Sequence, residues 1–401
     1  MKALHKFKTL NSTKNSEELA QVIQIDSAYT NCVLDDVWKE DGSWDALETH
    51  TPKTLWDEIS SAHFRAGAEF RLGNYVQAYK HHLDSYNAFL RAFQKMSRWG
   101  VHALFVMCSD LYKVAKRADR QLRMAGEQET KLEDATRAIN QGFSVCMTDR
   151  EPLLSKSRKW GTYRLANLLF ALYLRLKAYN LCTSMIRAIN ASELPSLDRF
   201  PMSDQVTFRY YRGILAFRSE KYAAAKDDLV FALEHCHRNA YHNRMQILIH
   251  LTPLLMMGGT MPKPWLLRKH APINDLYGDI SAAIKRGDLR EFDRLVSARE
   301  RHLVALGTFL AIEHSRKIAI RQLLYKTYLI GGKGSRIPLS QFQAAAAAAW
   351  RPTGAAETEC ILADMIFRGF VKGYLAHEHA TVVLSKQDPF PPLSSLSNPG
   401  T

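Results

Sequence analysis

Cysteine is scarce in this sequence, and its six residues are scattered. The chain of 401 residues contains no Cys-x-x-Cys pair. Short cysteine spacings are typical of structural zinc sites and of the disulfide frameworks of secreted domains. We therefore interpret the six as free thiols in a reducing compartment, and we expect neither kind of site. They are Cys32, Cys108, Cys146, Cys182, Cys236 and Cys360.

Long apolar runs are missing as well. No stretch reaches the roughly 18 consecutive apolar residues that a membrane-spanning helix needs. The first six residues, Met1–Lys6, include two lysines and a histidine, so they provide no apolar core for a signal peptide. We expect no membrane contact and no secretion signal.

The signatures of common catalytic folds are also absent. The sequence has no Gly-x-Ser-x-Gly elbow, no phosphate-binding loop and no kinase motif. The run Gly-Gly-Lys-Gly-Ser at 331–335 has the composition of a phosphate-binding loop, but no strand precedes it and its spacing differs. We interpret this run as a connector between helices. The sequence therefore predicts a non-catalytic protein without a cofactor.

Two histidine clusters resemble metal sites. His235 and His237 flank a cysteine in a predicted helix, where successive side chains point about 100° apart and cannot converge on one ion. His377-x-His379 resembles the zinc motif of isopeptidases of the signalosome and proteasome lid, but its distance to Ser385 is shorter, and no upstream glutamate that could activate water is evident. We interpret the second cluster as a turn that carries two solvent-facing histidines, and we expect no metal at either place.

Positive charge is in surplus. The chain has 54 Lys and Arg against 40 Asp and Glu, with a net charge of +14 and an isoelectric point near 9.4. This balance favours a polyanionic partner such as nucleic acid, an acidic protein or an anionic membrane. The length exceeds what one compact core usually holds, which predicts two or three packed units.

Paired helices occupy most of the chain before residue 313. The clearest pattern is an apolar stripe from Leu165 to Leu176 at helical spacing. Gly73-x-Tyr75-x-x-Ala78 has the turn spacing of tetratricopeptide-like pairs. Recurring pairs that cannot bury their apolar faces alone predict an all-α, right-handed solenoid of irregular repeats. The predicted helices are 64–72, 75–93, 101–118, 131–147, 165–176, 179–189, 208–217, 222–236, 279–285, 289–296 and 303–312.

The segment 316–392 has a different order of elements. Three helices are separated by the glycine run and by Pro352, and Gly369 is placed to end the third helix in the left-handed conformation. Two short strands follow, and three helices with a hairpin in this order are typical of a winged helix. The predicted helices span 318–330, 338–349 and 357–368, and the predicted strands span 371–375 and 381–385.

Basic residues gather at the helix ends and loops of this predicted winged helix. Flexible cations in such places suit phosphate contacts, which give affinity without reading sequence. The third helix carries Glu357, Glu359 and Asp364, which would repel phosphate, so we do not expect it to read bases. The candidate nucleic-acid-binding residues are Lys317 and Arg321 on one helix face, Lys333 and Arg336 in the glycine loop, Arg351, Arg368, Lys372 and Lys386.

A second use of the winged helix is edge-to-edge pairing with another protein. The wing strand and the apolar residues near it motivate this hypothesis. The candidate partner contacts are Phe367, Phe370 and Tyr374. Both uses of the winged helix stay open at this point.

Helical repeats that lead into a winged helix are the order of the PCI domain, which is shared by subunits of the proteasome lid, the signalosome and an initiation factor. Five blocks make the resemblance closer, and they are similar to the PCI-domain-containing protein two family, which includes signalosome subunit-twelve-like proteins. Segment 343–357, with its alanine run, departs from the family pattern. The blocks are 157–161, 186–189, 231–238, 371–374 and 383–393.

This resemblance implies a non-catalytic subunit of a nuclear transcription-and-export complex, with roles in messenger-RNA export and transcription elongation. Its implied partners are a large PCI scaffold subunit, a small acidic peptide shared with the proteasome lid, and RNA or double-stranded DNA. The resemblance also allows an accessory subunit of the COP-nine signalosome or of a splicing-linked complex, and it allows the cytoplasm besides the nucleus.

The same resemblance and the composition suggest domain boundaries. We expect a partly ordered segment, a helical-repeat region, a PCI domain with a helical part and a winged helix, and a tail. The expected ranges are 1–48, 49–200, 201–388 (201–312 and 313–388) and 389–401.

Overall fold

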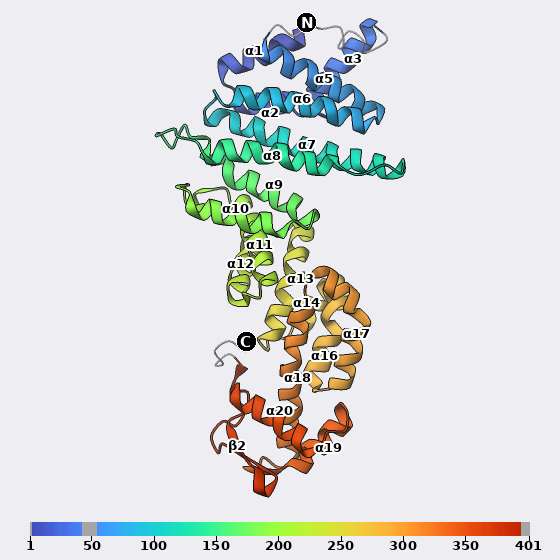
Figure 1. Cartoon of the computed structure of the whole chain (residues 1–401), viewed down its shortest axis with the longest axis vertical. Helices are drawn as coiled ribbons and strands as arrows, with labels where there is room; N and C mark the ends of the chain where they lie inside the picture. Colours follow the sequence, from blue (N-terminus) through green and yellow to red (C-terminus); the bar gives the residue numbers. More distant parts are fainter. Residues whose placement is uncertain (1, 42–53, 394–401) are drawn as a thin grey trace. The chain divides into compact units, whose positions relative to one another are not determined.

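The computed structural model describes residues 2–41 and 54–393, which are mostly helical (Figure 1). The chain forms two compact units, unit 1 up to Tyr211 and unit 2 from Arg212. Helix α11 (Met202–Arg218) contains the division. In this described part of the chain, no helix is long and apolar enough to cross a membrane.

Unit 1 is built from helices that pack against their neighbours in sequence, as predicted for helical repeats. Figure 1 shows α5 and α6 side by side, with α7 and α8 next to them. The helices before α11 are α1 (Lys2–Thr13), α2 (Ser16–Val22), α3 (Ala28–Asp41), α5 (Leu55–Leu72), α6 (Tyr75–Phe93), α7 (Val101–Met124), α8 (Lys131–Met147), α9 (Thr162–Arg175) and α10 (Tyr179–Ala191), with 3-10 turns η1 (Arg98–Gly100), η2 (Arg158–Gly161) and η3 (Leu197–Arg199).

The corner between α5 and α6 shows why this pair forms. Gly73 ends α5 with φ +81°, a left-handed conformation that glycine adopts without steric cost. Tyr75 then packs its ring edge-on against Phe70 at 5.6 Å, and Ala78 is fully buried against the first helix. The predicted tetratricopeptide-like turn is confirmed.

The first helices bear on one prediction. Within the range 1–48 that was predicted to be partly ordered, the structure has the helices α1, α2 and α3, and residues 42–48 lie outside the described residues. The side chains of Phe7, Leu19 and Leu34 are fully buried. The ring of Phe7 packs against Phe64 of α5 with centroids 5.9 Å apart, which ties α1 to the repeats.

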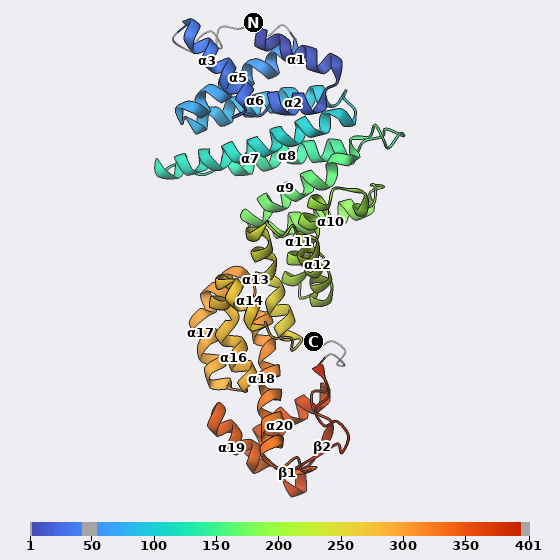
Figure 2. The same ribbon diagram turned by 180° about the vertical axis from the view of Figure 1, so that it is seen from behind.

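Unit 2 contains further helices and then a winged helix, which confirms the predicted fold class. Figure 2 shows β1 and β2 at the end of unit 2 that lies farthest from α13. Its elements after α11 are α12 (Tyr222–His235), α13 (Tyr241–Met257), α14 (Pro264–Lys269), α15 (Ala271–Ile273), a π turn η4 (Asn274–Gly278), α16 (Asp279–Arg286), α17 (Leu289–Leu306), α18 (Phe309–Ile330), β1 (Arg336–Pro338), α19 (Leu339–Ala349), α20 (Ala355–Phe367), β2 (Gly373–Ala376), η5 (His377–His379) and β3 (Thr381–Leu384).

One hydrophobic core joins the winged helix to the helices before it. Its buried members run from Met245 of α13 through Tyr277 and Phe292 to Phe342 of α19 and Val382 of β3. Helix α18 packs against α13, α16, α17 and α19 and so belongs to both parts. The predicted boundary between residues 312 and 313 lies inside this helix.

The helix predicted over 303–312 is wrong. Gly307 adopts φ +75° and ends α17, and α18 begins two residues later at Phe309. The amide of Gly307 donates to Val304 O, and the amide of Thr308 donates to Leu303 O, which closes the end of α17. The apolar pattern continues across this break, and that continuity is why periodicity alone predicted one helix.

The sheet has three antiparallel strands in the order β1-β3-β2. The predicted hairpin corresponds to β2 and β3, and the two histidines lie in the 3-10 turn between them. Strand β1 was not predicted, so Arg336 lies on a strand rather than in the glycine loop. Ile337 and Val382 pair across β1 and β3 and are buried, so this face of the sheet covers the core.

Two buried histidines make unit 1 sensitive to acid. His63 and His82 are fully buried, with Nε2 of His63 3.0 Å from Thr30 Oγ1 and Nε2 of His82 3.2 Å from Met107 O. Burial lowers the pKa of His63 from 6.5 to about 3, and His82 contributes to that shift. Burial likewise lowers the pKa of His82 to about 4. Both histidines are therefore neutral in the folded protein at pH 5.

This pair predicts a loss of stability in acid. The unfolded chain binds these two protons below about pH 6.5 and the folded chain does not, so the free energy of unfolding falls as the pH drops. We expect each histidine to cost about 2 kcal/mol between pH 7 and pH 5. Urea unfolding at both pH values measures the change.

The matched control for this measurement is an exposed histidine. A His63→Gln/His82→Gln variant is expected to be less stable at pH 7, and the difference in its free energy of unfolding between the two pH values should be smaller by about 4 kcal/mol. His242→Gln is expected to keep that difference, because His242 is exposed. An undiminished difference in the double variant would contradict the assignment.

Candidate nucleic-acid and partner interface on the winged helix

The solvent face of the sheet carries an exposed cation and an exposed aromatic ring. Arg336 of β1 and Tyr374 of β2 are both register partners of Val383 on the central strand, so the three residues form one row across the sheet. Val382 and Leu384 on either side of Val383 are buried, so this row faces away from the core. Tyr374 is 62% exposed.

Three lysines lie at one end of the same sheet. The amide of Leu384 donates to Ser335 O at 2.7 Å, and the amide of Ser385 donates to Lys372 O at 2.8 Å. These bonds extend the ladder toward Lys333 before β1 and Lys386 after β3. The strand register therefore places Lys333, Lys372 and Lys386 at the same end of the sheet, just before β1, just before β2 and just after β3.

The cations of this surface are loosely held. Lys333, Arg336 and Lys386 are exposed and form no ion pair within the described parts of the chain. Lys372 Nζ lies 3.8 Å from Asp388 Oδ2, and these two side chains are 53% and 54% exposed. An exposed pair at that separation contributes little stability, so the ammonium group is available to another anion. We call Lys333, Arg336, Lys372 and Lys386 the wing cations.

Each carboxylate of α20 has a nearby side-chain partner, an arginine for two of them and a histidine for the third. Arg351 binds both carboxylate oxygens of Glu357, and Arg368 Nε donates to Asp364 Oδ1 at 2.7 Å. Nδ1 of His377 in the turn lies 2.9 Å from Glu359 Oε2. Two arginines therefore offset part of the negative charge of this third helix, and His377 contacts its remaining carboxylate.

This pairing corrects two candidate nucleic-acid contacts. Arg351 is held by Glu357 and also lies over the Trp350 ring, with Cζ 4.3 Å from the ring centroid. Arg368 is 29% exposed in its pair with Asp364. Phosphate would have to compete with an existing carboxylate partner for either arginine, so neither offers a spare charge.

Lys317 and Arg321 share α18 but do not form an exposed basic face. Nη2 of Arg321 donates to Phe390 O at 3.1 Å and to Pro391 O at 2.7 Å, which anchors the segment after β3. Burial lowers the pKa of Arg321. Lys317 is half-buried, and burial and the nearby Arg368 lower its pKa. Arg321 is therefore engaged by backbone carbonyl groups of its own chain, and Lys317 is only partly open to an external phosphate.

The hydrogen bonds from Arg321 also bear on the C-terminal tail that was predicted over 389–401. Phe390 is buried, with its ring 5.3 Å from Tyr325 and 5.5 Å from Tyr328. Residues 389–393 therefore belong to the packed part of unit 2, and residues 394–401 lie outside the described residues.

The three candidate partner contacts have different environments. Phe367 at the end of α20 is 90% exposed, and Tyr374 on β2 is also open to solvent. Phe370 is 1% exposed and belongs to the core of unit 2. The prediction that Phe370 contacts a partner is wrong, because Gly369 turns the chain with φ +77° and directs the next residues inward.

The histidine clusters form no metal site in the described residues. No group of three His, Cys, Asp or Glu side chains there could hold a metal ion. His235 stacks on Phe231 with centroids 4.1 Å apart. His377 and His379 are exposed, as interpreted, but His377 pairs with Glu359, a contact that no sequence spacing indicated.

Comparison with known proteins finds relatives over most of the chain. The chain is 33% identical over 408 aligned residues to the Protein CSN12 homolog of Schizosaccharomyces pombe, which covers 96% of each chain. It is 36% identical over 353 residues to the Protein CSN12 homolog of Mycosarcoma maydis, covering 82% of this chain and 77% of the relative. It is 33% identical over 347 residues to PCI domain-containing protein 2 of Danio rerio, covering 85% and 86%. No family model matches the chain.

The two phenylalanines near Gly369 give a direct test of this interface. We expect Phe370→Ala to destabilise unit 2 by about 3–5 kcal/mol, because it removes a buried ring from the core. Phe367→Ala is expected to change stability by less than about 0.5 kcal/mol, since its side chain is exposed. Urea unfolding of both variants measures the contrast, and equal losses would contradict the assigned environments.

Proposed function

The chain belongs to the CSN12-like family of PCI-domain proteins, and from that premise we propose that it is a non-catalytic scaffold subunit whose winged helix contacts the backbone of RNA or double-stranded DNA. Its four wing cations carry this proposal. They lie on one edge strand and at one end of the sheet, and none is tightly paired. Phosphate is the ligand that such unpaired, flexible cations favour.

Backbone contact is favoured over base reading. The helix that usually enters the major groove, α20, presents three carboxylates that are already paired with Arg351, Arg368 and His377. The two arginine pairs offset the charge of Glu357 and Asp364, and the helix has no further basic side chain to direct at base edges. The wing cations supply affinity without sequence selectivity, and Tyr374, which lies in the same row across the sheet as Arg336, provides an exposed ring for stacking on an unpaired base.

The proposed setting is a nuclear complex that couples transcription to messenger-RNA export. Family resemblance supports this setting, and the relatives' names CSN12 homolog and PCI domain-containing protein 2 support a subunit of a multi-protein assembly. The proposed partners are a large PCI scaffold subunit and a small acidic peptide of the proteasome-lid type. The net charge of +14 suits both an acidic peptide and nucleic acid.

Removing the wing cations tests nucleic-acid contact. We expect Lys333→Gln/Arg336→Gln/Lys372→Gln/Lys386→Gln to weaken binding of a 20-nucleotide single-stranded RNA by roughly tenfold or more at low salt. The slope of log affinity against log salt should become shallower by about 3. Fluorescence anisotropy at several salt concentrations measures both quantities.

A charge-matched variant makes this experiment specific. Lys116→Gln/Arg120→Gln/Arg150→Gln/Arg187→Gln removes four exposed cations from unit 1 and lowers the net charge equally. We expect this control to keep nearly the full salt slope of the unmodified protein. If both variants lose slope equally, binding reflects overall charge and the proposed interface is wrong.

The exposed Phe367 and Tyr374 favour a second candidate function, pairing with another PCI protein without nucleic acid. An aromatic ring that is 90% exposed is unusual on a solvated surface and is typical of partner contacts. This alternative includes an accessory role in a signalosome or splicing-linked complex.

Point variants separate this alternative better than truncation. Cutting the chain at residue 313 would divide α18 and open the shared core. We expect Phe367→Ser/Tyr374→Ser to reduce capture of a PCI partner by about tenfold, since aromatic anchors dominate such interfaces, without changing the urea midpoint. Co-purification with the partner measures capture. Unchanged capture would exclude this surface as the pairing site.

A further inference from the structure

A cavity with a mixed polar and apolar wall lies within unit 1. Its volume is about 240 Å³, and α7, α9, the turns η1 and η2 and the start of α11 form its walls. Pockets for drug-sized ligands usually measure about 300–1,000 Å³, so this cavity accommodates a group the size of one side chain. Its walls combine arginines with aromatic rings and aliphatic residues.

Each of two arginines in the wall lies over an aromatic ring, and Arg164 also has the Asp204 carboxyl nearby. Arg98 lies over the ring of Trp160 at 4.6 Å, and Arg164 lies over the ring of Phe105 at 3.7 Å. Neither guanidinium donates a hydrogen bond or forms an ion pair within the described residues of the chain. Stacking fixes the plane of each guanidinium while its N–H donors stay unused.

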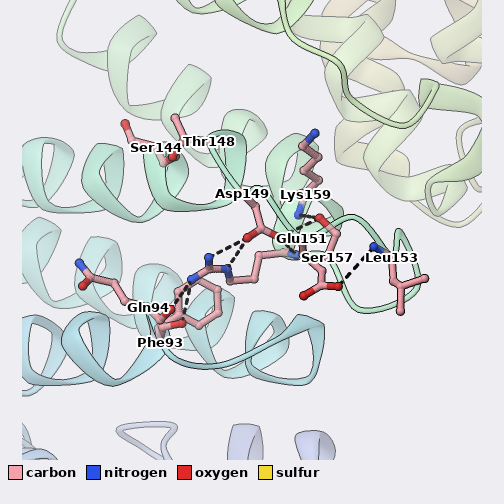
Figure 3. A network of polar contacts seen from close by, with 10 residues as sticks. Phe93, Gln94, Ser144, Thr148, Asp149, Glu151, Leu153, Ser157 and Lys159 are labelled. Atoms are coloured by element: carbon pink, nitrogen blue, oxygen red, sulfur yellow. Dashed lines mark hydrogen bonds and ion pairs between the residues drawn. The ribbon is translucent and has the colours of Figure 1, made fainter.

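A buried ion pair positions one of these rings. Asp149 accepts hydrogen bonds from Ser157 Oγ at 2.8 Å and from Arg158 Nη2 at 2.7 Å (Figure 3). Nη1 of Arg158 also donates to Gln94 O at 2.9 Å, which ties the η2 turn to the end of α6. Although burial opposes it, the hydrogen bonds from Arg158 hold the pKa of Asp149 below its ordinary value.

Trp160 is fixed by the same turn. It follows Arg158 in η2, and its Nε1 donates to Leu154 O at 2.7 Å. The ring beneath Arg98 is therefore set by hydrogen bonds that do not involve the cavity. A site whose donors are oriented before binding loses less entropy when it captures an anion.

The chemistry of these walls selects an anion over a nucleobase. Trp160 is already in contact with Arg98, Arg199 and the Phe200 ring, so it is poorly available for stacking on a base. Two free guanidinium forks match the oxygens of a phosphate monoester. The wall also includes Asp204, whose pKa is raised by burial and lowered in part by Arg164.

We propose that this cavity binds a phosphorylated serine or threonine side chain of a partner polypeptide, with Arg98 and Arg164 as the phosphate ligands. The aliphatic part of the wall, formed by Val101, Leu165 and Pro201, packs against the residue next to the phosphate. Both arginines are exposed at the cavity mouth, which lets a side chain enter from an extended segment. Phosphorylation of the partner then controls its attachment to unit 1.

The experiment uses the full chain and a fluorescein-labelled nonapeptide of glycine and alanine with one central phosphoserine. Matched peptides carry serine or glutamate at that position. We expect fluorescence anisotropy to detect binding of the phosphoserine peptide and at least tenfold weaker binding of the other two. Arg98→Gln/Arg164→Gln should weaken phosphoserine binding by at least about tenfold, whereas Arg150→Gln/Arg187→Gln should preserve it.

Each alternative outcome would overturn the proposal. Absence of binding, equal binding of the glutamate peptide, or equal loss in the control variant would exclude selective phosphate capture by these arginines. Displacement by inorganic phosphate at the same concentration as by the phosphopeptide would exclude a polypeptide as the preferred ligand. Stronger displacement by a 5′-phosphorylated pentanucleotide would assign the cavity to nucleic acid instead.

Discussion

The charge pairing around α20 decides what the winged helix offers to a partner. Glu357, Glu359 and Asp364 would repel any polyanion if they were unpaired, but Glu357 and Asp364 each pair with an arginine, and Glu359 has His377 of the wing turn as a hydrogen-bonding partner. That arrangement uses arginines that sequence alone assigns to nucleic acid. The positive charge that stays unpaired therefore lies on the sheet and its adjoining loops. This gives the winged helix an edge that can contact the nucleic-acid backbone, and it leaves α20 with carboxylates that already have partners.

A second constraint keeps this edge in place. The winged helix has no separate core, because buried residues of α13, α16 and α17 pack in the same cluster as those of α19 and β3. Helix α18 crosses this cluster, and Arg321 holds the chain after β3 through two backbone carbonyl groups. Arg321, which the sequence suggested as a phosphate contact, thus fixes the end of the sheet where Lys333, Lys372 and Lys386 lie. The surface charges depend on this core for their spacing.

Sequence predicted the features that local pattern controls. The apolar stripe of α9 and the turn at Gly73 rest on helical periodicity and on left-handed glycine, and both are found in the structure. The prediction of one continuous helix over 303–312 is wrong because Gly307 adopts a φ of +75°, which ends a helix even where the apolar spacing continues. Strand β1 is three residues long and gives no alternation to detect. The burial of Phe370 in the shared core and the contact of His377 with Glu359 arise between segments that are apart in the sequence, which no single-sequence pattern contains. The Asp364–Arg368 pair has the i, i+4 spacing of a helix and could have been predicted.

Mapping the nucleic-acid contacts tests the central claim most directly. Ultraviolet cross-linking of the full chain to 4-thiouridine RNA, followed by mass spectrometry of the linked peptides, identifies the surface without altering any residue. The account predicts cross-links in residues 331–336, 372–374 and 385–387, around the sheet and the loops at its end. Cross-links concentrated on α20, or found only in unit 1, would contradict it.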